Sequence, residues 1–251
     1  MPRPPKLTEL HCHILPRIDD GAQRVSDTEA LLDAERQDGV SQIFFTPHFY
    51  ADFMDAESFF RRRQKAFESI RTLCEEREME TALGAEVRIC EPLLNLDLSG
   101  LKMGKTHYLL LEWPFDGSYP IYGEEIVRDL LRAGIRPIFA HIERYDFFFY
   151  DEDNLQFFMD NGCLFQVNAE AFLYRETRRR AVELARTGYI HVLSTDAHNM
   201  DRRPPCLVQA LETLAAHTSY DLTDHLLRNA DDIFHDREVY PVVMPGRRHF
   251  F

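Results

Sequence analysis

The chain has 251 residues, enough for one large α/β barrel or for two small domains. Its 42 acidic and 29 basic residues give a formal net charge of −13, which argues against a general nucleic-acid surface because phosphate binding needs clustered positive charge. We expect neither a signal peptide nor membrane insertion, and five scattered cysteines without a Cys-x-x-Cys pair indicate reduced thiols in a cytoplasm.

Short apolar runs alternate with amphipathic helical patterns along the chain. The predicted strands span 7–10, 40–45, 81–83, 108–111, 136–140, 163–167 and 190–193. The first helix is predicted to begin at Ser26, an N-cap with Glu29 three residues later, and to end at Gly39. Later helices are predicted over 55–78, 123–133, 152–161 and 175–187, with a last one beginning near Pro204.

This alternation favours a mostly parallel sheet, closed here into a barrel of about seven units. Because no internal repeat or flexible linker interrupts the pattern, we interpret residues 1–251 as a single domain. In α/β barrels the active site forms at the C-terminal ends of the strands. The residues that follow each predicted strand therefore indicate the chemistry.

Histidines and acidic residues stand at or just after most of these strand ends. Nine of them are candidate metal ligands: His11, His13, Asp20, His48, Glu86, Glu112, His141, Asp196 and His198. Any one alone would be read as an ordinary polar residue, but nine converging groups would repel one another and resist burial without cations. A nitrogen and oxygen set without thiolate suits Mn²⁺, Fe²⁺ or Zn²⁺. Two or three such ions, about 3.5–4 Å apart, would hold a phosphoryl group and generate hydroxide.

The ordered motifs around these residues resemble the PHP (polymerase and histidinol phosphatase) superfamily. More narrowly, they are similar to the CpsB/CapC-type manganese-dependent protein tyrosine phosphatases of bacterial capsule and exopolysaccharide loci. The matching segments are His11-Cys12-His13-Ile14-Leu15-Pro16 with Asp19-Asp20-Gly21, Thr46-Pro47-His48, Gly84-Ala85-Glu86, Ala140 to Tyr145, and Asp196-Ala197-His198-Asn199 with Arg203-Pro204-Pro205. The resemblance covers nearly the whole chain.

The resemblance implies a distorted TIM-like (β/α)₇ barrel of the PHP type with three metal ions. By matching position, the first ion would be held by His11, His13, Glu86 and Asp196, the second by Glu86, Glu112 and His141, and the third by Asp20, His48 and His198. Arg144 and Arg203 match the family's phosphate-contacting arginines. His48 and His198 are both candidates for protonating the leaving oxygen, and the sequence does not choose between them.

The implied cofactor is Mn²⁺, two or three ions per chain, with Fe²⁺, Co²⁺ or Zn²⁺ left open. The implied substrate is the phosphotyrosine-bearing tail of a bacterial tyrosine autokinase. Two alternatives stay open: a small-molecule phosphoesterase such as histidinol phosphatase, and a catalytically silent metal-binding regulatory protein. A cysteine-based phosphatase is excluded because no cysteine begins a Cys-x₅-Arg loop. The sequence does not indicate the oligomeric state.

Five further features carry weaker signals. Arg17 stands where the family usually has glycine, and Phe49 where a second histidine is common. The aromatic run from Tyr145 to Tyr150 is expected to belong mostly to the core, with one ring near the substrate phenol. Asn168 ends a strand on the predicted active face and is a candidate for orienting a ligand. The arginines of the predicted helix 175–187 are interpreted as a solvated face rather than a dock for acidic tails.

Overall fold

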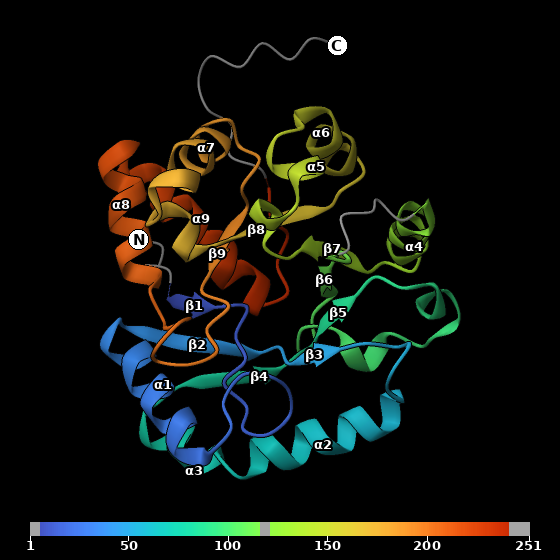
Figure 1. The fold of residues 1–251 in the computed structure, drawn as a ribbon, viewed down its shortest axis with the longest axis vertical. Coiled ribbons are helices and arrows are strands. Elements are labelled where there is room, and N and C mark those ends of the chain that lie inside the picture. Colours follow the sequence, from blue (N-terminus) through green and yellow to red (C-terminus); the bar gives the residue numbers. More distant parts are fainter. Residues whose placement is uncertain (1–5, 116–120, 241–251) are drawn as a thin grey trace.

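The strands form the middle of the molecule and the helices surround them (Figure 1). The structure, a computed structural model, describes residues 6–115 and 121–240. All strand pairs in this part of the chain are parallel. One sheet has the order β1 (Leu7–Glu9), β2 (Val40–Phe45), β4 (Glu80–Leu83). The other runs in the order β3 (His48–Phe49), β5 (Glu86–Arg88), β6 (Tyr108–Glu112), β7 (Arg136–Phe139), β8 (Leu164–Asn168), β9 (Val192–Ser194).

The two sheets are continuous because two strands bend from one sheet into the other. Only two residues separate β2 from β3, and only two separate β4 from β5. Backbone hydrogen bonds from Gly84 to Phe45 and from Glu86 to Pro47 carry the pairing across these bends, with N–O distances of 2.8 and 3.1 Å. With each bent pair counted as one strand, the described chain forms seven strands, as predicted.

The ring closes between the segments that follow β1 and β9. The N–H of His13 donates to the carbonyl of Ala197 and the N–H of Asp196 donates to the carbonyl of His11, both at 2.8 Å. The buried carboxylate of Glu9 reinforces this seam, because it accepts from the N–H groups of His11 and Thr195. The predicted distorted (β/α)₇ barrel is thus confirmed, and its closure depends on residues of the candidate site.

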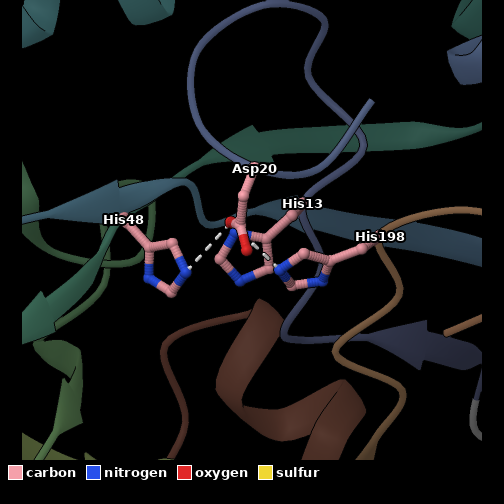
Figure 2. Close-up of side chains that lie close together, drawn as sticks. All are labelled: His13, Asp20, His48 and His198. Carbon is pink, nitrogen blue, oxygen red and sulfur yellow. Dashed lines mark ion pairs between the residues drawn. The ribbon is translucent and has the colours of Figure 1, made fainter. Parts of the chain in front are cut away.

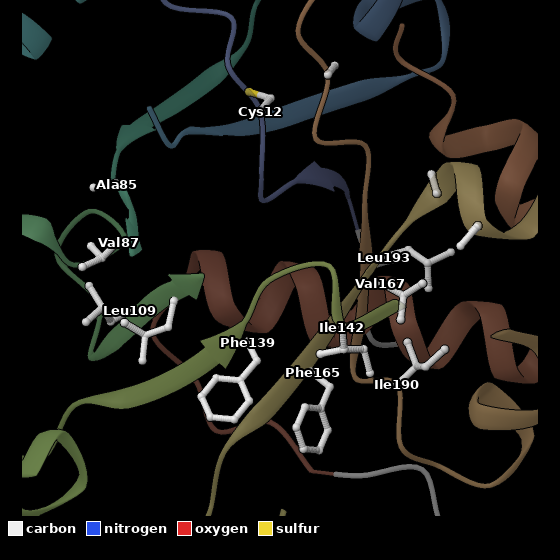
Figure 3. Close-up of a cluster of buried hydrophobic side chains, with 14 of the residues drawn as sticks. Cys12, Ala85, Val87, Leu109, Phe139, Ile142, Phe165, Val167, Ile190 and Leu193 are labelled. Atoms are coloured by element: carbon white, nitrogen blue, oxygen red, sulfur yellow. The ribbon is translucent and has the colours of Figure 1, made fainter. Parts of the chain in front are cut away.

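Alternation along the strands separates an inner from an outer core. The inner core contains Phe44, Leu110, Ile138, Leu164 and Val192, and the helix α9 (Tyr220–Phe234) packs Ala230 and Ile233 against it. The outer core lies between strands and helices; Figure 3 shows part of it, including Cys12, Leu109, Phe139, Phe165 and Val167. Inward-facing residues at the C-terminal end of each strand therefore point into the space above the inner core.

Most of the remaining helices of the described chain follow the predicted alternation, but the short helix Asp146–Phe149 and the helix α9 were not predicted. The remaining helices are α1 (Val25–Gln37), α2 (Ala56–Glu68), α3 (Arg71–Glu76), α4 (Ile121–Arg132), α5 (Asp146–Phe149), α6 (Glu152–Asp160), α7 (Arg175–Arg186) and α8 (Leu207–His217). Short 3₁₀ turns occupy Glu91–Asn95, Ser99–Leu101, Ile142–Arg144 and Ala169–Phe172.

Two helix predictions were wrong in detail. Ser26 is not the N-cap of α1: Arg24 has the extended cap conformation and the helix begins at Val25. The helix predicted over 55–78 is two helices, because the chain leaves helical geometry after Ser69, at Ile70. Ile70 is fully buried, so the break turns its side chain into the core.

Candidate metal centre

The structure brings all nine candidate ligands together at the C-terminal strand ends. Their ligand atoms form overlapping groups within 4.8 Å: His13, Asp20, His48 and His198; His11, Glu86 and His141; His11, His13 and Asp196; His48, Glu86 and Glu112. Seven of the nine are buried, His48 is partly exposed, and Asp20 lies at the surface with 66% of its side chain accessible. We call these nine residues the histidine–carboxylate cluster.

Glu86 lies at the centre of the cluster. Its Oε1 is 2.7 Å from Nε2 of His141 and 3.3 Å from Nε2 of His11. Its Oε2 is 2.7 Å from Nδ1 of His48 and 3.2 Å from Nε2 of His13. One carboxylate therefore faces four imidazoles on two sides, the arrangement expected of a carboxylate that bridges two cations.

The outermost group is drawn in Figure 2, where Asp20 reaches down between His48 and His198. Its Oδ1 is 3.4 Å from Nε2 of His48 and 3.3 Å from Nε2 of His198. The ring of His13 lies between them, with centroid distances of 4.3 Å to His48 and 4.0 Å to His198. His13 thus adjoins two groups, whereas the resemblance assigned it to one.

Asp196 is held by positive and polar groups on one oxygen and faces the histidines with the other. Nη2 of Arg144 lies 2.9 Å from its Oδ2, which also contacts the guanidinium of Arg203 and accepts from Nδ2 of Asn168 at 3.0 Å. Its Oδ1 is 3.4 Å from Nε2 of His11. The two expected arginines and Asn168 are therefore gathered on a single candidate ligand.

Two candidate ligands have an uncommon backbone conformation. Asp196 has φ of 53° and His141 has φ of 34°, in the left-handed region that non-glycine residues seldom adopt. Such conformations persist where surrounding contacts impose them, and they concentrate at functional sites. Arg17 also has a positive φ, of 60°, a conformation that glycine adopts more readily than other residues.

Two residues that orient histidines were given no role by the sequence. Asp19 Oδ2 lies 2.7 Å from Nδ1 of His13, and Gln166 Oε1 lies 3.1 Å from Nδ1 of His11 while accepting from the N–H of His141. Such partners fix the ring orientation of metal-binding histidines. Asp19 could have been found because it belongs to the motif that carries Asp20. For Gln166 the one signal is a polar residue at an inward-facing position of β8.

The electrostatics of the cluster reflect carboxylates buried among imidazoles. Burial alone would raise the pKa of Glu86 and of Asp196, but the neighbouring histidines hold both pKa values well below the ordinary range. Burial would lower the pKa of His48, yet Glu86 and Asp20 raise it to about 10; Glu112 and Glu86 likewise raise the pKa of His141 to about 9. Protons thus balance charge at positions where cations could replace them.

Several buried polar atoms of the cluster lack a hydrogen-bond partner within the described part of the chain. They are Oε2 of Glu86, Oε2 of Glu112, Oδ1 of Asp196, Nδ1 of His48 and Nδ1 of His141. Leaving such atoms without a partner costs free energy. Because Oε2 of Glu86 and Oδ1 of Asp196 face imidazole nitrogens, the donor set fits divalent cations with nitrogen and oxygen ligands.

Beside the cluster opens a cavity of about 210 Å³, which we call the mouth; it is lined by Phe115, Arg144, Tyr145, Asp146 and Phe147. Most of the aromatic run is core, as expected: the rings at 145, 148 and 149 are buried. The exposed ring at the mouth is that of Phe115, which the sequence did not single out.

The barrel and its cluster define a PHP-type barrel protein with a candidate multinuclear metal centre. The sequence profile of the capsular polysaccharide synthesis family CpsB/CapC matches residues 7–235, so the chain belongs to the CpsB/CapC family.

Relatives of this family align over most of the chain. Tyrosine-protein phosphatase YwqE of Bacillus subtilis is 27% identical over 240 residues, covering 93% of this chain and 94% of that protein. Tyrosine-protein phosphatase CpsB of Streptococcus pneumoniae is 29% identical over 225 residues, covering 83% of this chain and 90% of that protein.

Solved structures show the same fold. A crystal structure from work on YwqE of Bacillus subtilis and CpsB of Streptococcus pneumoniae, described as metal-dependent tyrosine phosphatases, superposes with a TM-score of 0.84 at 24% identity and covers 96% of this chain and 100% of that chain. The lactonase Lmo2620 of Listeria monocytogenes has a TM-score of 0.62 at 10% identity, covering 94% and 96%. No helix within residues 6–115 and 121–240 is long and apolar enough to cross a membrane.

Proposed function

We propose that this protein is a metal-dependent phosphotyrosine-protein phosphatase. It would act on the phosphotyrosine-bearing tail of a bacterial tyrosine autokinase that regulates capsule or exopolysaccharide synthesis, as a single cytoplasmic domain. The observation that carries the proposal is Glu86, whose two carboxylate oxygens face four imidazoles among further carboxylates. The names of the family's relatives support the reaction.

The proposed ligands are those of the cluster. His11, His13, Glu86 and Asp196 would hold one ion, Glu86, Glu112 and His141 a second, and Asp20, His48 and His198 a third. Because Nδ1 of His13 lies against Asp19, only its Nε2 is free for an ion. We propose Mn²⁺, with Fe²⁺, Co²⁺ and Zn²⁺ as alternatives. When bound, such ions would supply a nucleophile from water at neutral pH and polarise the phosphoryl oxygens.

Arg144 and Arg203 would bind the phosphoryl oxygens. Both guanidinium groups lie at the edge of the cluster and are about a quarter exposed, at 28% and 27% of the side chain. Arginine presents a planar fork of donors that matches phosphate and stays charged at all working pH values. Their shared contact with Asp196 would position both donors beside the reacting phosphorus and keep the phosphate oriented.

His198 suits a ligand better than a proton donor. Its Nδ1 lies 2.8 Å from the backbone carbonyl of Asp196, so this nitrogen carries the hydrogen. The lone pair of Nε2 then accepts from Nη1 of Arg203 at 2.9 Å, a contact that a bound ion would replace. Burial, together with the charges of His13 and Arg203, lowers the pKa of His198. A phenolate is a good leaving group, so tyrosine phosphate needs little help from an acid.

The test removes metal with a chelator and measures hydrolysis of a phosphotyrosine peptide with and without Mn²⁺, with histidinol phosphate in parallel. Mn²⁺-restored release from the peptide alone supports the proposal. Preference for histidinol phosphate would indicate a small-molecule phosphoesterase instead. Metal binding without release of phosphate from either compound would indicate a regulatory protein.

A pair of variants distinguishes an effect on the candidate site from an effect on folding. His141→Ala should lower turnover of the peptide at least 100-fold (about 2.7 kcal/mol) while far-ultraviolet circular dichroism stays unchanged. His217→Ala, at the exposed end of α8, is the control and should retain activity. Equal activity in the two variants would contradict the proposed role of the cluster.

A further inference from the structure

Phe115 is a large apolar side chain left open to solvent beside a charged cluster. It is 56% exposed. One side of its ring stacks on His141, with a centroid distance of 5.4 Å and an interplanar angle of 28°. The ring also stacks on Tyr145 at 5.3 Å and 14°. The ring is thus packed against two neighbours, while more than half of the residue stays exposed and it lines the mouth.

The segment that carries Phe115 is anchored in the core. The hydroxyl of Tyr145 donates to the carbonyl of Trp113 at 2.6 Å. The indole of Trp113 is buried and packs edge-on against Phe139 and Phe148, with both centroid distances 5.5 Å. A ring positioned in this way loses little conformational freedom when a ligand packs on it, which favours recognition.

Phe115 and Arg144 line the same cavity of about 210 Å³. Arg144 reaches from that cavity to Asp196, where its Nη2 lies 2.9 Å from Oδ2. A phosphate monoester bonded to Arg144 therefore places its ester group in the mouth. An alkyl group there would gain only apolar contact with the ring of Phe115, whereas a phenyl group could also form a stacked aromatic pair with it.

We propose that the open side of Phe115 is the surface on which the aromatic ring of the substrate packs, so that this residue selects aryl over alkyl phosphate monoesters. The inference rests on the proposed phosphatase function and names the residue that recognises the phenol half of the substrate. A stacked aromatic pair changes affinity by about three- to tenfold.

Binding of phosphonates, which are not hydrolysed, tests the subsite separately from turnover. Calorimetry on the Mn²⁺-loaded protein compares benzylphosphonate with propylphosphonate. We expect the unmodified protein to bind benzylphosphonate about three- to tenfold more tightly. Phe115→Ala should abolish this preference by weakening benzylphosphonate alone, and Phe115→Trp should retain it. Phe157→Ala is the matched control, since Phe157 is a 46% exposed phenylalanine on α6.

Other outcomes overturn the subsite. An unmodified protein without aryl preference would do so, and so would equal weakening of both phosphonates in Phe115→Ala, the result expected if Phe115 only covers His141. Turnover of phosphotyrosine is measured in parallel. Aryl preference without turnover would uphold the subsite and reject the proposed function, whereas turnover without aryl preference would reject the subsite and leave the proposed function standing.

Discussion

Oδ2 of Asp19 lies 2.7 Å from Nδ1 of His13 and also accepts the backbone N–H of His48 at 3.1 Å. Its other oxygen accepts the N–H of Gly21. One carboxylate therefore holds its own loop in shape and links the segment after β1 to the start of β3. It also fixes which nitrogen of His13 faces Glu86.

Asp19→Asn should weaken Mn²⁺ binding about 10- to 100-fold, the usual effect of removing a partner that orients a metal-binding histidine. The amide keeps the volume of the carboxylate but loses its charge and one acceptor. Metal titration followed by calorimetry measures the change. Asp27→Asn is the control, because Asp27 accepts only the backbone N–H of Gln23 in the same segment. Equal affinities in the two variants would refute the assigned role.

The two arginines on Asp196 should act on phosphate. Arg144→Gln and Arg203→Gln should each lower kcat/KM for a phosphotyrosine peptide about 10- to 100-fold, because each removes a charge-assisted hydrogen bond worth about 1.5–3 kcal/mol. Inhibition by inorganic phosphate should weaken in parallel. Arg202→Gln provides the control, since its exposed side chain neighbours Arg203 in sequence. Unchanged phosphate inhibition in both variants would show that the two arginines do not bind phosphate.

Metal removal should lower thermal stability. A ligand at about 100 times its Kd stabilises the folded state by about 2.7 kcal/mol, which corresponds to roughly 5–10 °C in Tm for a chain of this size. The physical cause is the set of buried carboxylate oxygens without a hydrogen-bond partner among the described residues, which includes Oε2 of Glu86 and Oε2 of Glu112. Thermal melts in chelator and in saturating Mn²⁺ measure the difference. Coincident melts would mean that the cluster binds no metal under those conditions.

The buried carboxylate of Glu35, which has no role in the candidate site, predicts that stability depends on pH. Both oxygens of Glu35 on α1 lack hydrogen-bond partners among the described residues. Burial, reinforced by the charges of Glu9 and Asp38, raises the pKa of Glu35 well above its ordinary value near 4.5. The folded state therefore holds this proton more tightly than the unfolded state, and stability falls as pH rises from about 4.5 towards the raised pKa.

Glu35→Gln should remove that loss, because an amide has no proton to release. Its Tm should match that of the unmodified protein below pH 4.5 and exceed it at pH 8. Melts across this pH range test the sign. Glu29→Gln, on the exposed part of the same helix, should show no comparable pH-dependent gain. A variant less stable than the parent at pH 8 would refute the argument.

Much of the barrel could be predicted because buried parallel strands read as continuous apolar runs. Val40–Phe45 has the predicted bounds, and Tyr108–Leu111 extends by one residue to Glu112. The strands β3 and β5 escaped prediction because they are two and three residues long and follow Thr46-Pro47 and Gly84-Ala85, which interrupt any apolar pattern. Their residues became strands only through pairing with each other and with β6.

The candidate ligands could be found because they recur in an order that a family shares, but their supporting contacts could not. Gln166 contacts His11 from 155 residues away, and nothing in its own neighbourhood indicates that contact. Phe115 follows the candidate ligand Glu112 by three residues, but nothing in the sequence distinguishes it from the other aromatic residues nearby, so only its stacking on His141 marks it. Partners of this kind are chosen by the folded arrangement rather than by local sequence.

The seam between the segments after β1 and β9 has a consequence for synthesis. It joins His11 and His13 near the start of the chain to Asp196 and Ala197 near its end. A ribosome makes the first segment long before the last, and contacts this distant in sequence are slow to form. A nascent chain therefore has no complete cluster until Asp196 and His198 have been synthesised. If the proposed function holds, a nonsense mutation anywhere before Asp196 would remove two candidate ligands and the closing seam together, so the shortened chain should be inactive.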